Sequence, residues 1–429
     1  MDVQLGVPTE ERQTLEEARR IHLPPRWVVA VSVAVAAAIL GDSLLYAVLP
    51  TQWPHLGLDV GMVGVLLGVN RLVRLASNPL AGWAVRRWGV NGPFLAALFA
   101  ASATTAAYGS GLGFLVLLTA RLLWGVCWSF LRLGGYLAAL DASNDGSRGY
   151  YLGFFNGVSR FGSFVAVLAG GILTDLMGFR ATVFLFTGLT LAGGLGVVRE
   201  RPARQAGNRP RAEEVVPSAA VVPLEGPEGT ARIWAVYAAV FVHGMAVSGL
   251  VTASLGLWLL TLYGSSTQVF FLTLGVATIT GSLLSARFLA DFLWGPFAGH
   301  LSDRYGRASL ALVVMAGEAA ALLGLAADGG LGWTVASALG LFLAATTLQV
   351  TLDATAGGLA PPARRALTMS WYATCLDLGA AIGPLVGYLV GVGVGLEWMY
   401  RGVAGLLVLV GLLYAVVFWR EIAARERAA

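Results

Sequence analysis

Residues 291–307, DFLWGPFAGHLSDRYGR, decide the fold of this chain. An apolar stretch ends there at a Gly-Pro pair, and a short polar loop follows. A weaker copy, RLASNPLAGWAVRRWGV, occupies residues 74–90. A fixed offset of about half the chain length predicts two homologous halves. Four aligned pairs are each 217 positions apart: Pro79 and Pro296, Gly82 and Gly299, Arg87 and Arg304, and Gly89 and Gly306.

The composition is that of a membrane protein. The 429 residues are 57% hydrophobic and 12% charged, with a mean hydropathy of +0.73. A soluble domain carries about a quarter charged residues, so a large soluble core is excluded. The net charge of +4 lies mostly in the segments between apolar stretches. We therefore expect a lipid bilayer as the partner of this charge, and no nucleic acid.

The apolar segments predict an all-α membrane protein of twelve transmembrane helices in two pseudo-symmetric six-helix bundles. Each segment is long enough to cross an apolar layer of about 30 Å, which needs about 20 helical residues. The expected spans are 27–50, 58–83, 93–110, 113–139, 150–177, 181–198, 232–263, 268–299, 308–327, 331–357, 366–394 and 398–419.

The distribution of arginine predicts the orientation. Loops on one side hold nearly all of the loop arginines, whereas the opposite loops hold little more than Arg180 and Arg401. By the positive-inside rule, both termini are expected on the cytoplasmic side of a multi-pass cell (inner) membrane protein. The expected parts are a cytoplasmic segment 1–26, a bundle 27–198, a proline-containing linker 199–231, a bundle 232–419 and a cytoplasmic tail 420–429.

The loop motif gives a resemblance. Residues 299–307, GHLSDRYGR, are similar to the loop signature of the major facilitator superfamily. In the first copy, Arg86 stands where that family usually has Asp, and Val90 where it usually has Arg. In the eleventh span, GAAIGPLVG at 379–387 resembles the Gly-Pro signature of antiporters, which that family normally carries in the fifth span. The signature residues that match in the second copy are Gly299, Asp303, Arg304, Gly306 and Arg307.

Two ionisable residues are candidates for proton coupling. Asp42 resembles the first-span acid of drug–proton antiporters, and Arg121 in RLLWG resembles an Arg-x-x-x-Gly signature that the family associates with proton coupling. Both lie at similar depth in their spans. A carboxylate changes its proton affinity when a nearby arginine comes and goes, so Asp42 is the expected proton carrier. The alternative is a static ion pair.

The two halves reverse sign at three of the 217-residue offsets. Arg74 aligns with Asp291, Arg86 with Asp303, and Arg160 with Asp377. In the resembled fold the second span faces the eleventh, and the fifth faces the eighth. We therefore expect two inter-half ion pairs, Arg74–Asp377 and Arg160–Asp291, which close the cytoplasmic side when the cavity opens outward. The alternative is neutralisation within each half, for instance between Arg287 and Asp291 at i,i+4.

Further polar residues within spans are expected to line the cavity, because ionisable groups in a membrane usually face a cavity or a partner. His243 is a lone histidine in the seventh span, for which packing is the alternative to a proton role. Glu318 is expected to face a polar neighbour. The cavity candidates are Arg71, Arg132, His243, Gln349 and Asp353.

Three classes of function are compatible with these residues. The leading interpretation is proton-coupled export of a small amphipathic or drug-like compound by alternating access, by a monomer. The alternative is uptake or facilitated transport of an organic anion in an arginine-rich cavity. A receptor or integral enzyme is the third class. The sequence has no zinc-ligand spacing, no Gly-x-Ser-x-Gly elbow and no phosphate loop, so we expect no enzyme activity, no metal and no cofactor.

Overall fold

The structure is a computed structural model. It describes residues 24–142, 148–200, 226–269, 272–327, 329–359 and 365–426. The expected N-terminal segment 1–26 and linker 199–231 therefore lie mostly outside the described residues. The predicted all-α fold of two bundles is confirmed, and helices cover nearly all of the described chain.

The first bundle contains six long helices and one short turn. They are α2 (Arg26–Gln52), the 3₁₀ turn η1 (Pro54–Leu56), α3 (Val60–Trp88), α4 (Asn91–Tyr108), α5 (Phe114–Ala142), α6 (Arg148–Met177) and α7 (Phe179–Glu200).

The second bundle is less regular, because two of its spans are interrupted. The seventh span consists of α8 (Gly226–His243), the π-helical segment η3 (Gly244–Val251) and α9 (Thr252–Tyr263). The eleventh consists of α14 (Arg365–Leu385), the π-helical η5 (Val386–Val390) and α15 (Gly391–Val394). The remaining helices are α10 (Val276–Leu293), α11 (Gly295–Tyr305), α12 (Arg307–Leu325), α13 (Gly330–Leu359) and α16 (Leu396–Glu426).

The expected start of the eighth span was wrong. The predicted span 268–299 begins only at Val276, because β1 (Ser266–Val269) and β2 (Leu272–Gly275) form an antiparallel hairpin before it. Alternating threonines and apolar residues in this stretch suit a strand better than a helix. The predicted tail 420–429 is also helical as far as Glu426, since α16 continues.

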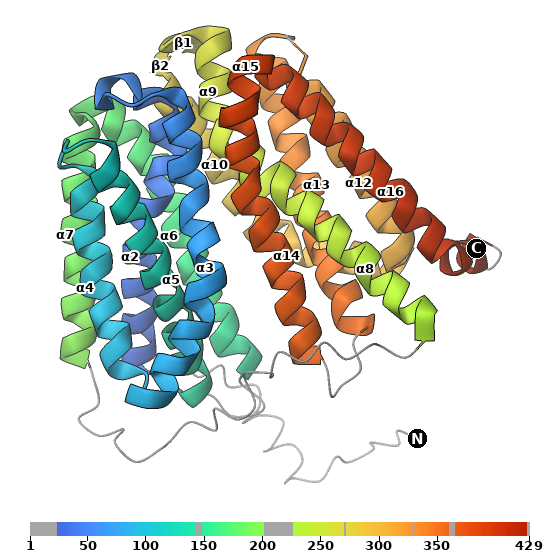
Figure 1. Ribbon diagram of the computed structural model, residues 1–429, viewed down its shortest axis with the longest axis horizontal. Coiled ribbons are helices and arrows are strands. Elements are labelled where there is room, and N and C mark those ends of the chain that lie inside the picture. Colours follow the sequence, from blue (N-terminus) through green and yellow to red (C-terminus); the bar gives the residue numbers. More distant parts are fainter. Residues whose placement is uncertain are drawn as a thin grey trace, which may run out of the picture.

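Eleven helices of the described chain are long and apolar enough to cross a membrane. The expected third span, α4, is not among them. Its 18 residues include Asn91, Gly92, Pro93 and two threonines, which lower its hydropathy. It nevertheless runs beside α5 and α7 in the first bundle (Figure 1). Eighteen helical residues rise about 27 Å, so α4 completes the set of twelve bundle helices.

The two bundles lie side by side with their long helices inclined to each other (Figure 1). Their ribbons converge at the end that carries the β1–β2 hairpin, which we call the hairpin end. They diverge at the opposite end, where α7 ends and α8 begins, which we call the linker end. Between the bundles α3 packs on α14, and α6 packs on α10. These are the pairings expected for spans two with eleven and five with eight.

Glycine allows this close approach at the hairpin end. A Cβ on Gly171 of α6 would come within 2.5 Å of the Ala277 carbonyl oxygen of α10. A Cβ on Gly68 of α3 would come within 2.8 Å of the Ala381 carbonyl oxygen of α14. Small residues let helix backbones pack closely where lipid offers no hydrophobic driving force.

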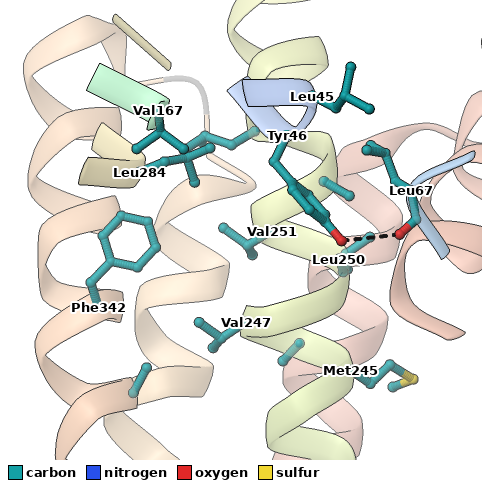
Figure 2. Close-up of a cluster of buried hydrophobic side chains, with 14 of the residues drawn as sticks. Leu45, Tyr46, Leu67, Val167, Met245, Val247, Leu250, Val251, Leu284 and Phe342 are labelled. Atoms are coloured by element: carbon teal, nitrogen blue, oxygen red, sulfur yellow. Dashed lines mark hydrogen bonds between the residues drawn. The ribbon is translucent and has the colours of Figure 1, made fainter. Parts of the chain in front are cut away.

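One buried apolar core continues across both bundles. Figure 2 shows the part where they meet, with Tyr46 from α2, Leu67 from α3, Val247 from η3 and Leu284 from α10. The Tyr46 hydroxyl donates a hydrogen bond of 3.3 Å to the Leu67 carbonyl (Figure 2). The seventh span therefore lies against the first bundle as well as within its own.

Candidate functional site

A pocket of about 160 Å³ lies between the bundles near the middle of the spans. Helices α2, α3, α5 and α6 supply its wall from the first bundle, and α9 and α10 supply the rest. The ionisable side chains that line it are Asp42, Tyr46, Arg71, Arg74 and Arg287. Its other lining residues are Ile39, Ser43, Trp124, Trp128, Ser163, Val167, Thr252, Leu284 and Phe288.

Asp42 and Arg121 form a buried ion pair at the edge of this pocket. Nη1 of Arg121 contacts Oδ1 of Asp42, and the same oxygen accepts a hydrogen bond of 2.8 Å from the Asn70 side chain. Arg121 is fully buried, and its Nε donates to the Leu66 carbonyl at 2.8 Å. Only Asp42 of the pair reaches the pocket. The structure thus brings together the two residues that we expect to couple protons.

Arg71 and Arg74 rest on aromatic rings of the first bundle. The guanidinium of Arg71 lies 5.8 Å from the ring centroid of Tyr46. Arg74 lies 5.6 Å from Trp128 and 5.8 Å from Trp124, whose rings stack on each other at 5.7 Å. Neither arginine forms an ion pair with any residue in the described ranges. Cation–π contacts hold these charges in place and leave them available.

Arg287 belongs to the second bundle and is held by the seventh span. Its Nη2 donates to the Ser248 hydroxyl at 2.8 Å, and its Nη1 donates to the Thr252 hydroxyl. The alternative expectation of an Arg287–Asp291 pair was wrong, because within the described chain Arg287 forms no ion pair. Arg287 and Asn70 are 217 positions apart, so the two halves place a polar residue beside the pocket at equivalent positions.

Arg160 and Asp291 form the expected contact between the bundles. Nη1 of Arg160 on α6 lies 2.5 Å from Oδ2 of Asp291 on α10. Thr346 of α13 donates a hydrogen bond of 2.8 Å to the other carboxylate oxygen. The Arg160 side chain is 55% exposed, so one partner of this pair is already in contact with solvent.

Arg74 and Asp377 are not joined in this conformation. Among the described residues no ion pair includes either of them, and the Nε of Arg74 has no hydrogen-bond partner. Asp377 nevertheless lies within electrostatic range of both Arg71 and Arg74. Of the two expected gate contacts, this conformation contains one.

Three cavity candidates lie away from the central pocket. Gln349 donates to Asp353 at 2.7 Å and to the Tyr372 hydroxyl at 3.0 Å, which forms a polar cluster between α13 and α14. Arg132 on α5 lies 5.7 Å from the Tyr136 ring. None of Gln349, Asp353 and Arg132 lines the 160 Å³ pocket.

His243 has a carboxylate partner in the second bundle. Its Nδ1 lies 2.8 Å from Oε1 of Glu318, and both residues are buried within the second bundle. His243 is the last residue of α8 and directly precedes the π-helical segment η3. Glu318 lies on α12.

The loop signature forms turns at the linker end. Gly89 and Gly306, which are 217 positions apart, end α3 and α11 with φ of +78° and +87°. Glycine adopts this left-handed region without a steric penalty, which explains its use at both helix ends. Arg307 donates to the Ala354 carbonyl at 3.0 Å, which ties the loop to α13. Gly299 lies in α11, Arg304 is exposed there, and the side chain of Asp303 lies outside the described residues.

The glycines of the 379–387 motif pack spans within one bundle. A Cβ on Gly383 would come within 2.5 Å of the Met245 carbonyl oxygen of η3, and Gly379 is in similar contact with Phe241. The motif therefore lies mainly against the seventh span, where it has a structural role.

A larger hollow of about 980 Å³ lies on the outside of the first bundle between α4 and α5. Its wall is mostly apolar and includes six alanines, and Cys127 is the one side chain in it that could ionise. Exposed Leu115 and Leu123 border it, as expected for a lipid-facing groove. The smaller central pocket is the better candidate site, because it combines fixed charges with aromatic walls between the bundles.

A family comparison agrees with this architecture. The model of the Major Facilitator Superfamily matches residues 31–291 and 277–429. The chain belongs to this superfamily. Membership indicates a multi-pass membrane transporter of a small-molecule substrate.

Individual relatives are more distant. A probable vesicular acetylcholine transporter-B from Danio rerio is 29% identical over 224 residues, which cover 48% of this chain and 45% of the relative. A vesicular acetylcholine transporter from Drosophila melanogaster is 27% identical over 157 residues, covering 36% of this chain and 27% of the relative. The chain thus spans less than half of the length of these relatives.

Solved structures of other transporters share the fold of this chain. A peptide transporter POT in complex with sulfate has a TM-score of 0.72 at 16% identity, covering 97% of this chain and 99% of that one. A bacterial homolog of the human lysosomal transporter Spinster has a TM-score of 0.72 at 13% identity, covering 91% and 96%.

Several site residues were missed by sequence reasoning. Asn70 beside Asp42, the clamp of Ser248 and Thr252 on Arg287, and the partner of His243 all lie far from one another in the chain. The 217-residue offset from Arg287 was available as a signal for Asn70. The hydroxyls of Ser248 and Thr252 gave none, since such residues commonly bond to their own helix backbone.

Proposed function

We propose that this protein is a proton-coupled secondary transporter that carries a small organic anion with an aromatic or apolar body. The observation behind this proposal is the set of three arginines, Arg71, Arg74 and Arg287, that line the central pocket without an ion-pair partner. The organic-anion alternative thus has more support from the geometry than the export of an amphipathic or drug-like compound.

The charges around the pocket support this substrate class. Asp42 is the one carboxylate in the pocket wall, and Arg121 already balances its charge. Asp377 lies nearby without direct contact and reduces the remaining positive charge. A substrate carboxylate, sulfonate or phosphate could take two parallel hydrogen bonds from a guanidinium, which is the geometry that arginine favours.

The aromatic residues in the pocket wall favour a substrate whose uncharged part is aromatic or apolar. Trp128 and the stacked Trp124 give a flat surface beside Arg74, and Phe288 lines the pocket near Arg287. A cavity of about 160 Å³ suits a small molecule such as an aromatic or branched carboxylate. In the proposal, the anionic group binds among the arginines and the apolar body lies on the tryptophan face.

Asp42 is the proposed proton carrier. It lines the pocket, and its partner Arg121 is completely buried. When Asp42 takes a proton, Arg121 loses its counter-charge, so the protonated state needs a rearrangement of α2 against α5. This coupling of protonation to helix movement is what a proton-driven transporter requires.

Alternating access follows from the two ends of the bundles. Close glycine contacts seal the hairpin end, and Arg160–Asp291 lies closer to the divergent linker end than the contact of Gly171 on the same helix. We propose that the linker end faces the cytoplasm, because most loop arginines lie in the segments that this end carries. The protein would then act in a cell membrane, as a monomer, with both termini in the cytoplasm.

A binding and flux experiment tests the proposal. Purified protein is screened by thermal shift against matched pairs of compounds, such as benzoate with benzyl alcohol and phenylacetate with phenethylamine. Anions should raise the melting temperature, and Arg74→Gln together with Arg287→Gln should abolish that rise. Proteoliposomes with an internal pH dye then report proton movement with the anion. Stabilisation by the neutral or cationic member alone would contradict the anion class.

A second candidate is proton-driven export of an organic cation. Two features favour it: Asp42 is a carboxylate in the pocket wall, and the curated relatives are named for acetylcholine, a quaternary ammonium. A cation would stack on Trp128 and displace Arg121 from Asp42. The same screen separates the two, because cationic compounds should then bind and Asp42→Asn should weaken them.

A further inference from the structure

The pair of His243 and Glu318 is buried, titratable and not used by the proposed mechanism. The atoms Nδ1 and Oε1 are 2.8 Å apart, and the two residues are 3% and 0% exposed. The second carboxylate oxygen of Glu318, Oε2, is buried without any hydrogen-bond partner. A buried carboxylate usually has both oxygens satisfied, so the orphaned oxygen marks a group that is expected to hold a proton in some state.

The surroundings of the pair contain few charges. Helices α13, α14 and α16 pack around α8 and α12. Of these, α13 carries Asp353, whose charge interacts with His243. The titratable groups in the middle of the other two helices are Tyr372, Cys375 and Asp377 on α14 and Tyr414 on α16. Neither Glu318 nor Asp353 forms an ion pair with an arginine of the described chain.

The proton count decides the charge of the pair. With one proton between them, the two side chains are neutral in sum, whether as imidazolium with carboxylate or as imidazole with carboxylic acid. Adding or removing one proton leaves a net charge in a dry interior, which is costly. The pair can therefore exchange a proton with water only when the helices around it move.

The pair is also connected to the central pocket. His243 directly precedes η3, whose Ser248 receives a hydrogen bond from Arg287, and Thr252 just beyond η3 receives another. Gly244 and Gly249 of η3 lie against α14 without room for a side chain. A π-helical segment commonly marks a functional site within a helix. A shift of η3 at His243 would therefore move the hydroxyls that hold Arg287.

From these contacts we propose that His243 and Glu318 form a second proton-binding site, within the second bundle, that is linked through η3 to Arg287 in the central pocket. The proton passes between the pair and water, and no other bond is made or broken. The link to transport rests on the proposed function, whereas proton binding at the pair does not.

Infrared difference spectroscopy on the purified protein tests the site itself. Spectra are compared between about pH 5 and pH 8, the range in which an unperturbed imidazole changes its charge. A carboxyl and an imidazole band should appear together in the wild type and disappear in Glu318→Gln. Glu200→Gln, at the exposed end of α7, is the matched control and should keep both bands. A difference spectrum that is unchanged in Glu318→Gln overturns the proposal.

Should Glu318→Gln fail to fold, the double variant His243→Phe with Glu318→Leu replaces both partners by apolar groups of similar size. Such replacements of buried polar pairs are often tolerated. This variant should lose both bands and keep a cooperative thermal transition. If it keeps the bands, they belong to other residues and the assignment to this pair is wrong.

Flux measurements test the link to transport. The number of protons moved per substrate should fall by one in Glu318→Gln, while substrate exchange at equal pH on both sides continues. Unchanged stoichiometry together with lost infrared bands would overturn the link and leave the proton site. Absence of proton movement in the wild type would instead count against the proposed proton coupling, and the infrared result would still decide the site.

Discussion

Arg160 of α6 and Asp291 of α10 form an ion pair of 2.5 Å across the two bundles, although they lie 131 positions apart in the chain. Asp291 also accepts a hydrogen bond of 2.8 Å from the Thr346 hydroxyl of its own bundle. Arg160 is 55% exposed. Water can therefore replace the arginine when the bundles separate, while Asp291 keeps one partner. This asymmetry suits a contact that opens and closes.

Charge reversal at this pair should affect transport more than stability. An exposed ion pair contributes about 0.2–1 kcal/mol, so Arg160→Asp should lower the melting temperature only slightly. It should reduce flux strongly, because two carboxylates then face each other between the bundles. Arg160→Asp with Asp291→Arg should recover part of the flux in proteoliposomes. Arg199→Asp at the exposed end of α7 is the control; equal flux loss there would point to a general charge effect.

The pair of Arg74 and Asp377 should form in another conformation. The two residues are electrostatically coupled here without an ion pair. Arg74→Asp should impair transport, and adding Asp377→Arg should partly restore it. Cysteines at both positions should cross-link more slowly when the protein is locked with its linker end open. A double variant that is no better than the single one, with no cross-link in any state, would remove this pair from the gate.

Variants of Asp42 should distinguish its contribution to thermal stability from its role in coupling protons to transport. Asp42→Asn leaves the fully buried Arg121 without its counter-charge, which should cost about 3–5 kcal/mol. Asp42→Asn with Arg121→Gln should restore most of the melting temperature, because both charges are gone. Each variant should move one proton fewer per substrate than the wild type. An unchanged number of protons per substrate in the stable double variant would show that Asp42 is not a carrier.

Substitution by alanine should have different effects at a glycine between the bundles and at a glycine within one bundle. Gly281 of α10 lies against the Val167 carbonyl of α6, so Gly281→Ala should wedge the bundles apart at the hairpin end. Labelling of an introduced cysteine near the pocket should then increase from that side. Gly383→Ala acts within one bundle, where it should lower stability by about 1–3 kcal/mol. Gly405 of α16 has open space around it, and Gly405→Ala should change neither property.

Much of the predicted fold came from the internal repeat. The 217-residue offset correctly predicted the two bundles, and Gly89 and Gly306 both end a helix with positive φ. It also led to the inter-bundle pairing of Arg160 with Asp291, because the charges reverse between equivalent positions of the two halves and the fifth span faces the eighth. The repeat did not predict the β1–β2 hairpin, because the first half has no hairpin at the equivalent positions.

Sequence by itself determined the class and the two-bundle arrangement of helices, because apolar length and an internal repeat fix these without knowledge of contacts. Only the tertiary structure decided which charges meet. Arg287 binds the hydroxyls of Ser248 and Thr252 and not Asp291, and His243 meets Glu318, because rotation of each helix about its axis sets the direction of a side chain. That rotation comes from packing of whole bundles, in which glycine contacts such as Gly383 on η3 fix how closely two backbones approach.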